Sequence, residues 1–253
     1  MTSLLPTNTS SSTHKVDVYG GKGIDLDTTG HSTAITIPQH YSTLQPFLPV
    51  YRGAKIANPS ALAFSAMGVS LYIVSIIALR GDGLKSLGII PAFALGYAAI
   101  ALLIAGIWEF PSGQTWGATV YISLSGFWAG LSLILSPWSG VAAAYAESPE
   151  ELGTAIGQFF FAWFITFVIF TIAAHRSSGG LLIFLGTSDF MLLFFALSFQ
   201  YPTHTVFLKA AGSFGIVGAF VAWYGALGSL LTNESSSFRV PVLGDFTTGI
   251  KSE

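Results

Sequence analysis

The chain has 253 residues, of which 52% are hydrophobic and only 9% charged, with no cysteine and a formal net charge of −2. Soluble domains usually carry about a quarter charged residues, so this chain lacks the polar surface for water and fits a lipid bilayer instead. The charge argues against a nucleic-acid partner, which needs a basic patch, and the lack of cysteine excludes disulfides, thiol catalysis and thiolate metal sites.

The two ends of the chain differ from its middle in composition. Residues 1–57 are polar, rich in Ser, Thr, Gly and Pro, and contain no apolar stretch long enough for a cleaved signal. We expect a disordered N-terminal tail there. Residues 233–253 are polar again and are expected to form a C-terminal tail. A membrane domain is therefore expected at residues 58–232.

Six apolar stretches fill this middle part, each close to the roughly twenty residues that a membrane-spanning helix needs. They lack the alternation of apolar and polar residues that marks a barrel strand. They occupy residues 61–79, 87–108, 117–135, 152–174, 180–199 and 210–231. The sequence therefore predicts an all-α, polytopic membrane protein with six transmembrane helices. Six spans place both termini on one side, and a small excess of Lys and Arg there favours the cytoplasm.

Small residues recur at helical spacing in several spans. Such pairs let helix backbones approach closely in lipid. Packing within one bundle is the preferred interpretation, and contact between subunits is the alternative. The pairs are Gly126 and Gly130, Gly153 and Gly157, Ala92 and Gly96, and Gly218 and Ala222.

Motifs of enzymes and pumps are missing. The sequence has no Walker loop, nucleophile elbow or dinucleotide fingerprint, and its five histidines are scattered through tails and loops without metal-ligand spacing. We therefore expect no catalytic residue, no metal and no cofactor. Passive or ion-coupled transport is the function class that remains.

The first span opens with Asn58-Pro59. Proline suits the first helical turn and Asn is a strong N-cap, so a purely structural role is the simplest interpretation. A helix N-terminus also carries free N–H donors and a positive dipole end. Such ends bind anions, including substrate carboxylates in transporters.

Asp189 is the only charged side chain well inside a span. An acid at the centre of a membrane helix costs about 2.5 to 3.5 kcal/mol on insertion scales, so it should face protein or water. Two roles are given equal weight: a proton relay, or a hydrogen bond from the protonated acid to a neighbouring helix.

Other polar candidates lie on the second and third spans. Thr119 interrupts the third span as a candidate pathway residue, although hydroxyls in a span more often bond the preceding helical turn. Glu109 ends the second span, where a capping or interfacial role is the simpler interpretation.

Three motifs in register with the six spans resemble the acetate uptake transporter family, which includes the bacterial succinate–acetate permease and fungal acetate and ammonia-export proteins. The family signature begins Asn-Pro-Ala-Pro-Leu-Gly-Leu, its second span closes with Ala-Gly-x-x-Glu, and a Gly-Asn-Thr-Phe-Gly-x-Thr turn follows. The resemblance covers about residues 51–233. The matching segments here are Asn58-Pro59-Ser60-Ala61-Leu62, Ala105-Gly106-Ile107-Trp108-Glu109 and Gly113-Gln114-Thr115-Trp116-Gly117.

The resemblance implies six helices per subunit, a ring-shaped homohexamer, and one anion pathway through each subunit for acetate and similar small acids, with protons. Asn58, Pro59 and Glu109 match the family motifs directly. The resemblance also implies a hydrophobic narrowing at Met67, at Leu124 and at or beside Asp189.

Several positions depart from the family pattern. The family commonly has Phe and Tyr at the first two positions of the narrowing, its second signature proline is Ala61 here, its glycine is Ala63, and a glutamine of the second span is Leu102. These changes alter both the width and the hydrogen bonding of the path, which set the solute that passes.

The expected function is therefore a transporter or channel for small monocarboxylates in the plasma membrane, with acetate as the leading candidate substrate. Movement of ammonia or another small neutral solute is one alternative. A non-transporting membrane sensor of the same family is another.

Overall fold

The structure is a computed structural model that describes residues 57–80 and 88–231, together with Ser236 and Val240. The N-terminal tail expected at residues 1–57 lies outside the described residues except for Ala57. The C-terminal tail expected at 233–253 lies outside them except for Ser236 and Val240. Both tails stay predictions.

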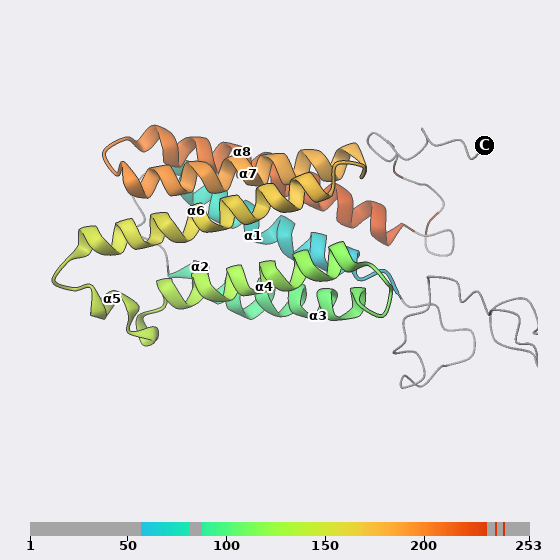
Figure 1. The fold of residues 1–253 in the computed structure, drawn as a ribbon, viewed down its shortest axis with the longest axis horizontal. Helices are drawn as coiled ribbons and strands as arrows, with labels where there is room; N and C mark the ends of the chain where they lie inside the picture. Colours follow the sequence, from blue (N-terminus) through green and yellow to red (C-terminus); the bar gives the residue numbers. More distant parts are fainter. Residues whose placement is uncertain (1–56, 81–87, 232–235, 237–239, 241–253) are drawn as a thin grey trace, which may run out of the picture. The chain divides into compact units, whose positions relative to one another are not determined.

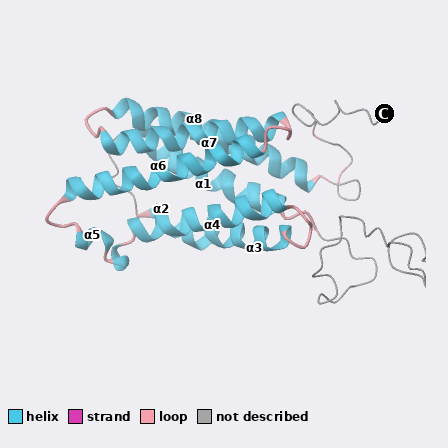
Figure 2. Ribbon diagram, in the orientation of Figure 1, coloured by secondary structure: helices cyan, strands magenta, loops and turns pink. Residues whose placement is uncertain are grey.

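Six helical stretches of the described chain are long and apolar enough to cross a membrane (Figure 1). Every predicted span is found, with each end within five residues of its expected place. The described residues contain helices and loops but no strand (Figure 2), which confirms the all-α class. The stretches are α1 (Ser60–Arg80), Ile89–Glu109, α4 (Thr115–Leu135), α6 (Pro149–Ala173), α7 (Gly179–Gln200) and α8 (Thr205–Leu230).

The second stretch is not a regular α-helix. It consists of α2 (Ile89–Phe93), a π-helical turn η2 (Ala94–Ala99) and α3 (Ile100–Glu109). A π-turn holds one more residue per turn than an α-helix and is frequent at functional sites. Its alanines Ala94, Ala98 and Ala99 are buried, so the wider turn packs against the bundle through small side chains.

Shorter elements join α4 to α6. The third span ends at residue 135 as predicted, because Ser136 is extended and a 3-10 turn η3 (Pro137–Ser139) follows. Gly140 then takes a positive φ of 76°, which favours glycine, and leads into the short helix α5 (Val141–Ala144). Pro149 opens α6, with Glu150 and Glu151 in its first turn, where their charge suits the helix dipole.

The long helices pack as neighbours: α1 along α8, α8 along α7, α7 along α6, and α3 against α4. At one end of the bundle lie the start of α1, the turn from α3 to α4, the turn from α6 to α7 and the last turn of α8 (Figure 1). We call this the terminal end. Helices α1, α4 and α7 therefore all begin there and run in the same direction.

The pairs of small residues divide between two roles. Gly157 faces the backbone oxygen of Ala196 on α7, and Gly218 faces Leu71 on α1 and Thr187 on α7, so these glycines bring helices together within the bundle. A Cβ on Gly96 or Gly126 would meet nothing within 4 Å. Those two therefore lie on faces that the described chain leaves open.

Candidate functional site

The tip of α1 is capped as the sequence predicts. The side-chain oxygen Oδ1 of Asn58 accepts a hydrogen bond from the backbone N–H of Ser60 at 3.1 Å. The carbonyl of Pro59 accepts from the N–H groups of Leu62 and Ala63, at 3.1 and 3.2 Å. Because Oδ1 takes a backbone donor, the other end of the Asn58 side chain is the amide Nδ2, which retains its two N–H donors.

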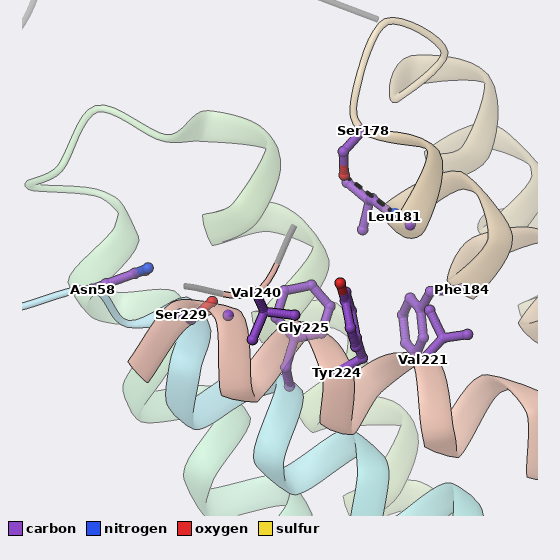
Figure 3. Close-up of a pocket in the computed structure, with 12 residues that line it drawn as sticks. Asn58, Ser178, Leu181, Phe184, Val221, Tyr224, Gly225, Ser229 and Val240 are labelled. Atoms are coloured by element: carbon purple, nitrogen blue, oxygen red, sulfur yellow. Dashed lines mark hydrogen bonds between the residues drawn. The ribbon is translucent and has the colours of Figure 1, made fainter. Parts of the chain in front are cut away.

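A pocket of about 320 Å³ lies beside this tip, at the terminal end between α1, α7 and α8. Figure 3 shows Asn58 at its rim, with the amide nitrogen turned toward the side formed by Ser229 and Val240. The floor and walls are mostly apolar, so the few polar groups around it would fix how a small solute lies. The other lining residues include Phe64, Ser178, Phe184 and Tyr224.

A second pocket of about 350 Å³ lies on the other side of the same tip, lined by Asn58, Pro59, Leu62 and Trp108 among others. It lies between α1 and α3. Asn58 therefore stands between two hollows at the terminal end, and both Asn58 and Pro59 line at least one of them.

Aromatic rings form the next layer of the site. The ring of Phe64, which lines the first pocket, meets Tyr121 of α4 edge-on at 6.5 Å and Phe184 of α7 edge-on at 5.8 Å between ring centroids. The three parallel helices α1, α4 and α7 thus each contribute one ring here.

The predicted narrowing follows about one helical turn deeper. Met67 comes three residues after Phe64 and Leu124 three residues after Tyr121, and they are 3% and 2% exposed. Since α1 and α4 run in the same direction, both residues lie on the next turn of their helices, behind the rings. On α7 the corresponding position, four residues after Phe184, is Ser188, which is also buried.

Asp189 turns away from this line of residues. Its Oδ2 accepts a hydrogen bond of 2.8 Å from the hydroxyl of Thr171 on α6. Its Oδ1 is buried and has no hydrogen-bond partner. The buried residue beside it, Ser188, donates to the carbonyl of Phe184 on its own helix. Asp189 therefore joins α6 to α7 through one oxygen and leaves the other available.

Glu109 is 3% exposed, far more buried than an interfacial residue would be. The hydroxyl of Ser60 donates to its Oε1 at 2.8 Å, and the hydroxyl of Tyr121 donates to Ser60 at 3.1 Å. Gly117 leaves room for the carboxylate, since a Cβ there would lie 3.2 Å from its Cδ. The three side chains tie together the starts of α1 and α4 and the end of α3.

Thr119 is not brought into this group. It is exposed, and its hydroxyl donates to the carbonyl of Thr115 on its own helix at 2.8 Å. This is the common arrangement for a hydroxyl in a membrane helix. A place for Thr119 in the pathway stays a prediction.

Beyond the predicted narrowing the interior is mostly apolar, with the hydroxyls of Ser75 and Ser132 among its buried polar groups. A void of about 30 Å³ is lined by Val74, Leu131 and Phe195 with other apolar side chains of α1, α2, α4, α6 and α7. Trp128, one turn before Leu131, has a buried indole N–H without a hydrogen-bond partner. No group of three His, Asp or Glu residues in the described chain is placed to hold a metal ion.

Sequence reasoning missed Ser60 and Tyr121. Ser60 stands where the family signature has alanine, and this difference was the available signal. Tyr121 gave none, because a tyrosine in an apolar helix is common and its partner lies 61 residues away.

Residues 40–244 match the model of the GPR1/FUN34/yaaH family. Among curated relatives, accumulation of dyads protein 2 of Saccharomyces cerevisiae is 32% identical, over 77% of this chain and 68% of its own length. Ammonia transport outward protein 2 of the same yeast is 30% identical, over 78% and 70%. Acetate permease A of Emericella nidulans is 30% identical, over 80% and 75%.

The fold is similar to that of a solved structure. The bacterial acetate channel SatP superimposes with a TM-score of 0.63, covering 74% of this chain and 99% of the channel, at 24% sequence identity. At this identity the likeness extends to the arrangement of the six helices.

Proposed function

Because this chain belongs to the GPR1/FUN34/yaaH family, we propose that it is a transmembrane transporter or channel for small monocarboxylates, with acetate as its first substrate. Relatives named as acetate permease and as ammonia transport protein support a transporter rather than an enzyme. The observation that carries the proposal is the Asn58-capped tip of α1, which lines a pocket about one helical turn from the buried Met67 and Leu124 of the predicted narrowing.

The chemistry of this tip suits a carboxylate. A small carboxylic acid ionises like a side-chain carboxyl, with a pKa of about 4, so near neutral pH the anion dominates and cannot cross lipid unaided. The Nδ2 of Asn58 and the positive end of the α1 dipole offer donors and a favourable field to that anion.

The narrowing supports passage of a small solute without its hydration shell. Met67 and Leu124 present carbon and sulfur rather than hydrogen-bonding groups, so a large or doubly charged solute loses more there than acetate does. Asp189 belongs to the proposal through its unpartnered Oδ1, next to the buried Ser188, as a group able to take a proton during transport. Glu109 and Pro59 belong to it as supports of the α1 tip.

A homo-oligomer fits the outward faces of the bundle. Gly96 and Gly126 meet no neighbour within one subunit, and small residues of this kind allow close approach between helices in lipid. We place six copies in the ring, as the family resemblance implies. The plasma membrane and cytoplasmic termini complete the proposal, on the small excess of Lys and Arg that the sequence has on the side of the two termini.

Ammonia is the second candidate solute. Two curated relatives are ammonia transport outward proteins, and an apolar narrowing without the family's aromatic residues suits a small neutral molecule. Acetate and ammonia make different demands on Asn58, because only the anion needs its donors.

Reconstitution into liposomes tests the proposal. Purified protein should accelerate uptake of radiolabelled acetate over protein-free liposomes, and a panel of small acids and ammonium should rank the solutes. Acetate uptake that ammonium does not reduce supports the carboxylate function. Ammonium flux without acetate flux would replace it with the second candidate.

A further inference from the structure

Two buried side chains, Glu109 and Tyr121, and the partly buried Ser60 form one directed series of hydrogen bonds at the terminal end. The Tyr121 hydroxyl donates to Ser60 Oγ, and the Ser60 hydroxyl donates to Glu109 Oε1. The proposed function uses Glu109 only as a support and Ser60 and Tyr121 not at all. Glu109 is only 3% exposed, so solvation at the membrane interface does not account for its position.

The surroundings of Glu109 hold few charges. From α1 it is faced by Ser60, which does not titrate, and from α4 by Gly117 and by Tyr121 through Ser60. None of the described Lys, Arg and His residues forms an ion pair with it. The hydroxyl chain is therefore the means by which its protonation state is felt elsewhere in the fold.

The direction of donation along this series of hydrogen bonds depends on whether Glu109 carries a proton. An ionised carboxylate only accepts hydrogen bonds, which forces the order Tyr121 to Ser60 to Glu109. When a proton from water neutralises the carboxylate, its new O–H group donates to Ser60 Oγ. The Ser60 hydroxyl then turns to donate to the Tyr121 oxygen, and the Tyr121 O–H is released from the chain. One proton is taken up, and no other covalent bond changes.

The ring that carries this O–H group lies between the pocket and the predicted narrowing, and the O–H group itself lies beside Ser60 at the start of α1. The Tyr121 ring meets Phe64, which lines the pocket together with Asn58, and Tyr121 comes one turn before Leu124. We propose that protonation of Glu109, passed through Ser60, frees the Tyr121 hydroxyl to hold a carboxylate at this point of the path. The inference rests on the proposed carboxylate transport.

Proton and anion then favour each other. A carboxylate held by Tyr121 keeps the chain in its reversed order, which stabilises the proton on Glu109, and coupling between two binding sites is reciprocal. The consequence is that acetate binds more tightly to the protein in acidic medium. The hydrogen bonds from Tyr121 through Ser60 to Glu109 would thus couple the uptake of one proton to the binding of one anion.

The test measures the half-saturating acetate concentration in proteoliposomes from neutral to acidic pH. Flux in protein-free liposomes is subtracted, because it reports the neutral acid that crosses lipid. For the wild type we expect this concentration to fall as the pH falls. A hydrogen bond to a charged group changes affinity by about tenfold, so we expect the half-saturating concentration to change by that factor.

Three substitutions address the three members of the chain. Glu109→Gln carries a permanent N–H donor toward Ser60, as the protonated acid would, and should give the low half-saturating concentration at every pH. Tyr121→Phe removes the O–H donor and should give the high half-saturating concentration at every pH. Ser60→Ala cuts the chain and should abolish the pH dependence even though Glu109 and Tyr121 remain.

The matched control is Ser65→Ala. Its hydroxyl bonds the carbonyl of Ala61 within the same helix, so it should keep the wild-type pH profile. Ser60→Ala also keeps the N-cap, because the bond to Asn58 comes from the backbone of Ser60. If Glu109→Gln fails to fold, Ser60→Ala still decides the question.

The two proposals fail in different ways. Acetate transport with a pH profile that Ser60→Ala leaves unchanged would overturn the chain and leave the carboxylate function standing. Absence of protein-dependent acetate flux in the wild type would overturn both.

Discussion

A Cβ added to Gly212 of α8 would lie 2.8 Å from the backbone oxygen of Ser75 on α1 and 3.0 Å from the backbone nitrogen of Leu79. Both are main-chain atoms, which cannot turn aside as a flexible side chain would. We therefore expect Gly212→Ala to separate α1 from α8 and to lower stability by about 1–3 kcal/mol, as overpacking does. Thermal unfolding in detergent measures it. Gly228→Ala on the same helix, where a Cβ meets nothing within 4 Å, should be neutral.

Asn58 is expected to act both as a cap and as a donor, and two substitutions separate these roles. Asn58→Asp keeps a capping oxygen but loses the N–H donors and adds a negative charge, so we expect acetate uptake to fall by about tenfold or more while the helix stays capped. Asn58→Ser also keeps a capping oxygen and adds no charge, so its acetate uptake should fall less. Uptake per molecule at the surface is the measurement. Wild-type uptake in Asn58→Asp would remove this residue from the pathway.

Leu124 is predicted to limit the width of the path. Leu124→Ala should raise the flux of propionate or succinate relative to acetate, because the narrowing loses most of a buried side chain. The same substitution is expected to lower stability by about 2–5 kcal/mol, so the ratio of fluxes, not the absolute rate, is the quantity to measure. Leu133→Ala, at an exposed position of the same helix, should leave the ratio unchanged.

Asp189 is predicted to change the pH dependence of the maximal transport rate, in contrast to the change in half-saturating concentration expected of Glu109. Asp189→Asn keeps an oxygen for the Thr171 hydroxyl but cannot ionise. Thr171→Val is the matched variant, since it removes the hydrogen bond and keeps the acid. Stopped-flow uptake at saturating acetate over a range of pH measures the effect. An unchanged profile in Asp189→Asn would leave only the hydrogen bond between α6 and α7.

Gly126 is predicted to lie against another subunit. Gly126→Leu adds a bulky side chain where one subunit has open space, so the subunit should fold normally while the oligomer weakens. Size-exclusion chromatography with light scattering in detergent reports the mass of the particle. A particle of wild-type mass would place the interface elsewhere on the bundle.

The helices were predictable because lipid imposes a simple rule on the sequence. A span must be apolar for about twenty residues, and charged residues such as Arg80 and Glu109 mark the ends of the first two. The N-cap of α1 was predictable for a similar reason, because Asn58 and Pro59 act locally on the turn that follows them.

Contacts across the bundle were not predictable in the same way. Ser60 and Glu109 lie 49 residues apart, and nothing in either segment alone points to the other. The side to which Asp189 points was not predictable either, because a register error of one residue on the helix decides whether Asp189 or Ser188 faces the path. The π-turn leaves no mark in composition, since alanine is equally at home in a regular α-helix.

That turn has a consequence for the far end of its helix. An α-helix advances by about 100° per residue, and the wide turn at Ala94–Ala99 absorbs an extra residue before α3 begins. A chain of the same length wound as a regular α-helix through this segment would arrive at Glu109 rotated by about that angle. The carboxylate would then leave Ser60 and swing toward the hydrocarbon. The angular setting of the acid is thus fixed more than two helical turns before the acid itself.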